Sequence, residues 1–147
     1  MNNYIMDVRP YLPSDRDGCL AVFDSNSPDF FTPEDRGNFV EALDGSQVLY
    51  FTMEHEGAIV GCGGYSPGEP ARLVWGMVHR NWQRQGLGRF LLLFRLREIS
   101  KTGGVAMVYA EAPRSAARFF EGQGFRLAGQ DGDANRVVMA KKLTVCP

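Results

Sequence analysis

The sequence predicts one mixed α/β domain, in which a sheet of six to seven strands packs against about four helices. Strand-like and helix-forming apolar segments alternate along the whole chain. The turn signal His55-Glu56-Gly57 predicts a hairpin between two of the strands. From Leu73 to Tyr109, a strand, a glycine loop, a helix and a strand follow one another, which predicts a parallel pair with a right-handed crossover. The length of 147 residues suits a single domain over 1–147.

Composition excludes several classes of function. Hydrophobic residues make up 44% and charged residues 22%, as is typical of soluble globular proteins. The net charge of -1 gives no electrostatic reason to expect a nucleic acid or an anionic membrane as partner. No apolar run approaches the ~20 residues of a spanning helix, and the N-terminus lacks the pattern of a secretory signal.

The cysteine pattern favours the cytoplasm. Cys19, Cys62 and Cys146 are scattered, without CxxC spacing, and fit reduced thiols better than a disulfide framework. Only two histidines, His55 and His79, are present, and no metal-ligand cluster stands out. We therefore expect a cytoplasmic protein that uses no metal.

The first part of the chain should form a strand and two helices. The strand is expected over Tyr4–Tyr11, because strand formers precede Pro13 there. Ser14 is expected to cap the first helix. A second helix should start at Thr32, where Thr, Pro and two acids form a typical first turn, and should end at Asp44-Gly45.

The middle of the chain should form a hairpin and a buried strand. The hairpin strands are expected over Val48–Glu54 and Ala58–Tyr65. The following strand, Leu73–Val78, is almost continuously apolar, which indicates that both of its faces are covered. Three glycines in the second hairpin strand predict either a bulge or a close backbone approach: Gly61, Gly63 and Gly64.

The rest of the chain should add two helices and three strands. A deeply packed helix should follow the glycine loop and close between Lys101 and Gly104. The remaining expected elements are a strand over Val105–Tyr109, a short helix from Ser115, a strand over Phe125–Ala128, a polar loop over Gly129–Asn135, and a last strand from Val137 to about Leu143.

The glycine loop predicts an anion site. A loop that opens a helix leaves backbone N–H groups unpaired at the positive end of the helix dipole. Gly86 and Gly88 lack a Cβ and allow a ligand close to the backbone. Polar and charged neighbours add donors, so the expected ligand is a phosphate or pyrophosphate. The loop lacks the Gly-Lys-Ser/Thr of a P-loop, and Leu91 replaces the third glycine of the dinucleotide pattern.

Two motifs together resemble the GNAT superfamily of N-acetyltransferases. The order Gln-x-x-Gly-x-Gly is present at Gln83, Gly86 and Gly88, with the strand-ending Val78 at the expected distance. A second motif, 116–125, has an aromatic pair and ends in Gly-Phe. The resemblance covers nearly all of the chain. It implies a mixed, mostly antiparallel sheet that splays between its fourth and fifth strands, Leu73–Val78 and Val105–Tyr109.

The resemblance also implies an acyl-CoA site in that gap. The pantetheine arm would pair with the backbone near Gly76, Met77 and Val78, and Phe120 would lie beside the cofactor. Gly76 would leave room for the cofactor or would serve packing, and both interpretations stay open. The pyrophosphate would be held by the loop residues Gln83, Arg84, Gln85, Gly86, Leu87, Gly88 and Arg89.

Two departures from the family pattern affect the proton steps. Family members often place a glutamate base on the fourth strand, where this chain has Trp75, and a tyrosine acid before the Gly-Phe, where it has Phe120. Both rings are interpreted as core or as the wall of the site. Glu111 is then the candidate base, against a solvated carboxylate. Tyr109 is the candidate acid, against a buried strand tyrosine.

The acceptor site should form near the loop between the first two helices. An amine would be attracted by acids and could stack on aromatic rings there. Capping of the second helix by Glu34 and Asp35, and a hydrophobic staple by Phe31, are equally weighted alternatives. The residues expected at this site are Asp29, Phe30, Phe31, Glu34 and Trp75, with Asp133 from the last loop.

The resemblance therefore predicts an enzyme, an N-acetyltransferase that moves an acetyl group from acetyl-CoA to a primary amine of a small molecule or peptide. The competing hypothesis is a non-catalytic acyl-CoA-binding sensor or interaction domain, because the usual glutamate and tyrosine are missing. The length of the acyl group stays open, as do a monomer and a homodimer.

Overall fold

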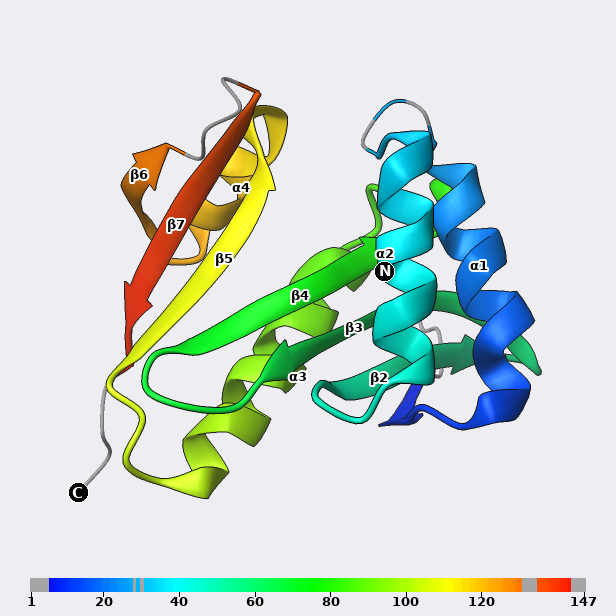
Figure 1. The fold of residues 1–147 in the computed structure, drawn as a ribbon, viewed down its shortest axis with the longest axis horizontal. Helices are drawn as coiled ribbons and strands as arrows, with labels where there is room; N and C mark the ends of the chain where they lie inside the picture. The colour runs from blue at the N-terminus through cyan, green and yellow to red at the C-terminus, as the bar shows by residue number, and fades with distance from the viewer. Residues whose placement is uncertain (1–5, 28, 30, 131–134, 144–147) are drawn as a thin grey trace.

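A computed structural model describes residues 6–27, 29, 31–130 and 135–143. Their strands form one seven-stranded sheet in the order β1-β2-β3-β4-β5-β7-β6 (Figure 1). Only β4 and β5 pair in parallel; the other neighbours are antiparallel. The strands are β1 Asp7–Pro10, β2 Leu49–His55, β3 Ala58–Ser66, β4 Ala71–Val78, β5 Met107–Pro113, β6 Arg126–Gln130 and β7 Arg136–Lys142. The mixed, mostly antiparallel sheet predicted from the sequence is confirmed.

Helices cover both faces of this sheet (Figure 1). The α-helices are α1 Arg16–Ser25, α2 Pro33–Asp44, α3 Leu87–Thr102 and α4 Ala117–Gly122. Short 3-10 helices are η1 Pro13–Asp15, η2 Arg80–Trp82 and η3 Arg114–Ala116. Helix α1 packs on β3, α3 packs on β3 and β4, and α4 packs on β6 and β7. None of the helices in the described part of the chain is long and apolar enough to cross a membrane.

The starts of α1 and α2 differ in how well the sequence predicts them. The Thr32 hydroxyl accepts the Asp35 N–H and the Asp35 carboxylate accepts the Thr32 N–H, a capping box that confirms the predicted start of α2. The predicted cap at Ser14 is wrong, because η1 precedes α1 and Ser14 lies inside it. The Asp15 carboxylate instead accepts the Leu12 N–H.

The β2–β3 hairpin has the predicted turn. Glu56 and Gly57 have φ angles of 49° and 82°, the left-handed pair of a two-residue turn. The glycines of β3 allow neighbouring groups to approach its backbone closely. A Cβ on Gly64 would lie 2.3 Å from the Leu49 carbonyl oxygen, so a side chain at that position would collide with β2.

The irregularity between β3 and β4 lies in β4. Cys62 pairs with Met77 and Gly64 pairs with Val74, so one β3 residue faces two residues of β4, Trp75 and Gly76. This arrangement is a β-bulge, and the Trp75 φ of 51° is its left-handed residue. The bulge turns Trp75 toward α1 and α2, where it packs with the cluster around Phe23 and Phe39.

The strands of the C-terminal half are shifted from their predicted positions. Strand β5 begins and ends later than predicted and includes Glu111 and Pro113. Strand β6 continues to Gln130, into the segment that the sequence predicted as loop. Pairing of β5 and β6 with β7 explains both extensions, because alternation alone does not show how far a neighbouring strand supports the ladder. Cys19 and Cys62 are buried free thiols, and Cys146 lies outside the described residues.

We predict that the buried carboxylate of Asp15 stabilises the fold in a pH-dependent way. Its two oxygens accept Arg9 N–H groups at 2.7 and 2.8 Å, and this pairing lowers the pKa of Asp15 below its usual value. Asp15→Asn should lower the free energy of unfolding by about 2 kcal/mol at neutral pH, the scale of hydrogen bonds to a charged group.

The sign of the pH effect follows from the lowered pKa. The stabilisation is complete above the unfolded-state pKa of about 4 and is lost as the pH falls through the folded-state value. Urea unfolding at several pH values should therefore show that the free energies of unfolding of the wild type and of Asp15→Asn become equal at acid pH. Asp44→Asn is the control. Asp44 forms a solvent-exposed ion pair with Arg16, so this substitution should change the free energy of unfolding little. Equal loss in both variants would contradict the assignment.

Candidate active site

The two halves of the sheet separate between β4 and β5. The parallel ladder joins only three pairs, Ala71 with Val108, Arg72 with Tyr109 and Leu73 with Ala110. Beyond Leu73 the strands diverge, and the rest of β4 has no strand partner on that side (Figure 1). The splay predicted between the fourth and fifth strands is therefore present. Along 74–77, the backbone groups on that side of β4 have no partner from β5.

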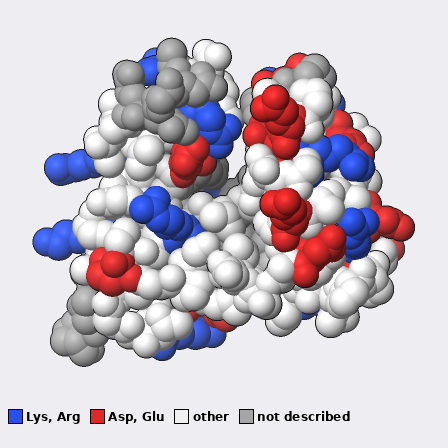
Figure 2. Space-filling model, viewed as in Figure 1, with Lys and Arg blue, Asp and Glu red and all other residues white. Residues whose placement is uncertain are grey.

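A cleft of about 550 Å³ fills this opening. Figure 2 shows the molecule hollowed between the two halves of the sheet, with acidic side chains gathered over α2. The cleft is lined by Phe31, Asp35, Asn38, Leu73, Val74, Trp75, Gly76, Arg95, Ala110, Glu111, Ala112, Pro113, Ala116, Phe120 and Arg136. Residues from α2, β4, α3, β5, α4 and β7 thus converge on one concave surface, as is usual for a small-molecule site.

The wall on the α2 side is aromatic and polar. Phe31 stacks on Phe23 at 4.7 Å between ring centroids, which explains its position better than the predicted alternative of a hydrophobic staple. The ring centroid of Trp75 lies 6.1 Å from that of Phe31 and 5.3 Å from that of Phe39. Asp35 and Asn38, two residues that sequence reasoning did not select, line this wall because they lie one turn apart on α2.

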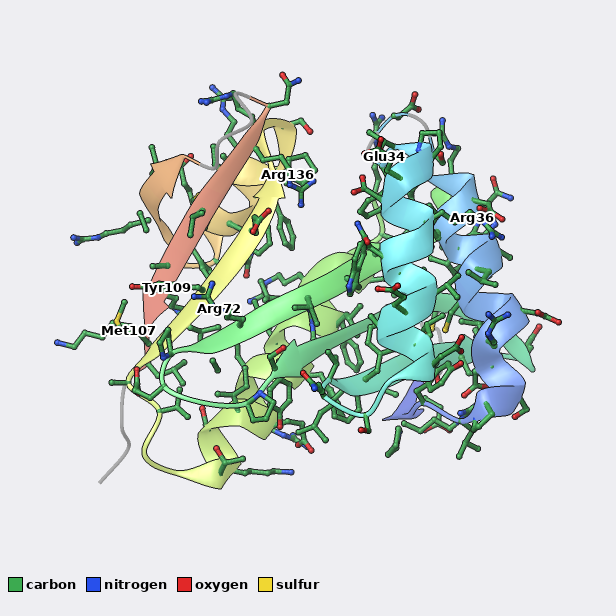
Figure 3. All side chains as sticks on the ribbon, viewed as in Figure 1. Glu34, Arg36, Arg72, Met107, Tyr109 and Arg136 are labelled. Carbon is green, nitrogen blue, oxygen red and sulfur yellow. The ribbon has the colours of Figure 1, made fainter. Side chains whose placement is uncertain are left out.

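The other predicted acceptor residues do not line the cleft. Asp29 forms an ion pair with Arg80 of η2, so its carboxylate is neutralised locally. Glu34 is exposed near the start of α2 (Figure 3). A helix start carries acids on more than one side, and of these acids only Asp35 lines the cleft; the acceptor roles of Asp29 and Glu34 stay predictions. Phe30 and Asp133 lie outside the described residues.

The two candidate proton carriers lie on the same face of β5 but at different points along the strand. Glu111 lines the cleft, and its carboxylate forms an ion pair with Arg136 of β7 at 3.4 Å. Tyr109 does not line the cleft, because it lies on the paired part of β5 below the splay. The Arg72 guanidinium lies 5.7 Å from the centre of the Tyr109 ring (Figure 3). The geometry therefore favours Glu111 and not Tyr109 as a participant.

The Tyr50 side chain holds the backbone of the β4 bulge in place. Its hydroxyl donates a 2.7 Å hydrogen bond to the carbonyl oxygen of Trp75. Burial raises the pKa of Tyr50 well above its usual value, so the phenol stays protonated as a donor. The strained φ of Trp75 is thus held by the Tyr50 hydrogen bond and by packing of the Trp75 ring on Phe39, which also contacts Tyr50.

Gly76 is small because a buried guanidinium lies against it. A Cβ on Gly76 would come within 2.6 Å of Arg95 Nη2, and one on Gly63 within 3.1 Å of Arg95 Cζ. Arg95 extends from α3 toward β3 and β4 and is only 5% exposed. Of the two interpretations of Gly76, the structure supports packing against Arg95. Met77 and Val78 are buried in the core on opposite sides of β4.

The loop after β4 is tied to the sheet by amides. Gln83 donates to the Val78 carbonyl at 2.9 Å and to the Asn26 side-chain oxygen at 2.6 Å. Asn26, which is buried, donates to the same carbonyl at 3.0 Å. Both N–H groups of the Gln83 amide are therefore used inside the protein. The Gln83 side chain therefore holds the loop against β4, and its predicted contact with the cofactor stays a prediction.

The start of α3 has the unpaired N–H groups on which the predicted anion site depends. Gly86 is the N-cap, with a left-handed φ of 83°. The first helical bond runs from the Phe90 N–H to the Gly86 carbonyl, which leaves the preceding N–H groups of Leu87, Gly88 and Arg89 without intrahelical acceptors. Leu87 itself is buried in the core.

Charge around this helix start is positive. Arg84 and Arg89 are exposed and form no ion pair within the described part of the chain. Gln85 is half-buried, and its side-chain oxygen has no hydrogen-bond partner there. The cations and the N–H groups of α3 thus offer charge and donors to an anion at the start of this helix.

The two loop glycines should respond differently to alanine. Gly86→Ala should lower the free energy of unfolding by about 1 kcal/mol, because alanine disfavours the left-handed φ. Gly88 has an ordinary helical φ, and a Cβ there would lie no closer than 3.8 Å to Phe119. Gly88→Ala should therefore leave stability equal or higher. Thermal unfolding of both variants is the measurement, and equal destabilisation would show that Gly88 is also structural.

A protein-family model matches part of this chain. Residues 46–127 match the model of the acetyltransferase (GNAT) domain. The matched segment begins before β2 and ends in β6, so it contains both strands of the cleft and the start of α3. No curated protein matches the chain.

Solved structures share the whole fold. The ribosomal-protein-S18-alanine N-acetyltransferase of Escherichia coli is 21% identical with a TM-score of 0.78, and 97% of each chain is covered. An acetyltransferase from Thermus thermophilus is 25% identical with a TM-score of 0.76, covering 97% of this chain and 100% of that one. The PaiA N-acetyltransferase of Thermoplasma acidophilum, solved with coenzyme A, is 14% identical with a TM-score of 0.74, covering 95% and 99%.

Proposed function

The chain belongs to the GNAT family of acetyltransferases, and on that basis we propose that it moves an acetyl group from acetyl-CoA to a primary amine of a small molecule or peptide. One observation carries the proposal: β4 and β5 diverge into a cleft, and the start of α3 lies close to the end of β4, where an added Cβ on Gly88 would contact Val78 and Phe119. A thioester with a pyrophosphate tail matches both features. The Thermoplasma relative of the same fold binds coenzyme A.

Acetyl-CoA would lie along the unpaired edge of β4. Its pyrophosphate would bind the N–H groups of Gly88 and Arg89 and the guanidinium of Arg84. Its pantetheine arm would pair with the free backbone groups near Gly76, beside the ring of Phe120. The carbonyl of Val78 already accepts two amides, so pairing would be made by residues before it. No metal is needed in this arrangement.

The acceptor amine would enter from the α2 side. Asp35 and Glu111 give that side two carboxylates, and Phe31 and Trp75 give it two aromatic faces. Such a surface attracts an ammonium group and can cover its apolar part. Transfer then requires that the ammonium lose a proton, that the nitrogen attack the acyl carbon, and that the sulfur leave.

The first test is binding of the donor. Calorimetric titration of the protein with acetyl-CoA should show one site. Gly88→Ala should weaken binding at least tenfold, about 1.4 kcal/mol, because its Cβ would enter the space beside the unpaired N–H groups. Gly37→Ala is the matched control, since Gly37 also lies in a helix with nothing within 4 Å of an added Cβ. Wild-type affinity in Gly88→Ala would remove the loop from the site.

Turnover separates an enzyme from a sensor. A panel of amines that includes polyamines, amino acids and peptides with free N-termini should contain acceptors that release free coenzyme A, detected by its thiol. Binding of acetyl-CoA without release by any amine would instead support the non-catalytic acyl-CoA sensor.

The second residue-level test concerns the general base. Glu111→Gln should lower kcat/KM for the acceptor at least tenfold, because no carboxylate would remain at that part of the cleft to take the proton. Tyr109→Phe should change kcat/KM less than tenfold, because Tyr109 lies outside the cleft. Steady-state kinetics with both substrates would measure this. A larger loss in Tyr109→Phe than in Glu111→Gln would reverse the assignment.

A further inference from the structure

Arg95 is an unusual residue for its position. It lies on the buried face of α3, whose other buried members are all apolar: Leu87, Leu91, Leu92, Leu96 and Ile99. Its side chain is 5% exposed, and it forms no ion pair with any carboxylate in the described part of the chain. A buried cation without a counter-ion costs stability, so ordinary core packing does not account for it.

Its hydrogen bonds are also few for a guanidinium with five N–H donors. Nε donates to the Leu91 carbonyl at 3.4 Å and Nη1 to the Gly64 carbonyl at 3.3 Å, both long. Nη2 has no hydrogen-bond partner among the described residues. The titratable groups that act on it from the packed strands are the Tyr50 phenol and the Cys62 thiol, and neither is a carboxylate.

The chain makes space for this cation. A Cβ on Gly76 of β4 would collide with the guanidinium, and a Cβ on Gly63 of β3 would crowd both the guanidinium and the Gly76 backbone. Burial lowers the pKa of Arg95 to about 10, so the group still carries its charge near neutral pH. A positive charge is therefore maintained inside the protein, against the bulge of β4.

Arg95 faces the same cleft as Phe120. Phe120 cannot donate a proton, and Tyr109, the other candidate acid, lies outside the cleft. The other charged groups that line it, Asp35, Glu111 and Arg136, come from α2, β5 and β7. Glu111 and Arg136 pair with each other. Arg95 is thus the unpaired cation of this cleft among the described residues.

We propose that Arg95 stabilises the thiolate of coenzyme A as it leaves. In the reaction the C–N bond forms, the thioester C–S bond breaks, and the sulfur takes both bonding electrons. The amine loses its proton to a base, and nothing is oxidised or reduced. A fixed cation beside the sulfur would favour the charged thiolate without transferring a proton. The inference rests on the proposed acetyl-CoA site.

The test measures the thiol of bound coenzyme A and does not need an acceptor. The ultraviolet absorbance of the thiolate is followed against pH for coenzyme A in complex with the protein, with S-methyl-coenzyme A as the blank. The scan runs from about pH 6 to about 9, where the guanidinium stays charged. The wild-type complex should titrate at least one pH unit below free coenzyme A. Arg95→Met should return the thiol to its free value, and Arg95→Lys should give an intermediate shift.

Arg97→Met is the matched control, because Arg97 lies on the same helix and is exposed. In this variant the thiol of bound coenzyme A should titrate as it does in the wild-type complex. Thermal unfolding provides the second measurement: Arg95→Met should unfold at the same or a higher temperature than the wild type, since methionine removes an unpaired buried charge. A lower unfolding temperature with an unchanged thiol would make Arg95 a structural residue and overturn the proposal.

The remaining outcomes are also decisive. If coenzyme A binds and its thiol titrates alike in wild type and Arg95→Met, the proposal fails while the proposed function stands. If Arg95→Met instead weakens only succinyl-CoA relative to acetyl-CoA, the counter-ion of Arg95 is a carboxylate, which also overturns it. If the wild-type protein binds no coenzyme A in calorimetry, both the proposed function and this inference fail.

Discussion

The divergence of β4 from β5 is the constraint on which the rest of the site depends. A parallel pair that separates after Leu73 and Ala110 leaves one edge of β4 unpaired inside the protein. Buried backbone groups need partners, so such an edge is stable only beside solvent or a ligand. The bulge at Trp75 and the amides of Asn26 and Gln83 hold this edge from both ends.

Local features of the fold could be predicted from the sequence because they depend on near neighbours. The capping box at Thr32 and the turn at Glu56-Gly57 involve residues within four positions of each other. The glycine loop before α3 was found for the same reason. The ends of β5 and the 3-10 turn before α1 were missed, because strand pairing and the Asp15–Arg9 contact decide them.

The candidate site was predicted unevenly for a similar reason. The loop that should bind pyrophosphate is a contiguous segment, and its geometry follows from its own residues. The cleft walls come from seven elements, the short η3 among them, and sequence alone does not show which side of each faces inward. Asp29 and Asp35 are both acids near the start of α2, yet one pairs with Arg80 and the other lines the cleft. On β5, Tyr109 and Glu111 share one face, and only the point at which β4 diverges decides that Glu111 lines the cleft.

Arg95 shows what only the assembled structure could reveal. In the sequence, an arginine in an apolar helix and two glycines in neighbouring strands are three separate exceptions to good packing. In the fold they are one feature, because Gly63 and Gly76 make the space that the guanidinium fills. A chain that accepts two weakened strand positions and an unpaired buried charge loses stability at three places. Such a loss is expected where function requires the charge, and the place where these residues meet is the wall of the cleft.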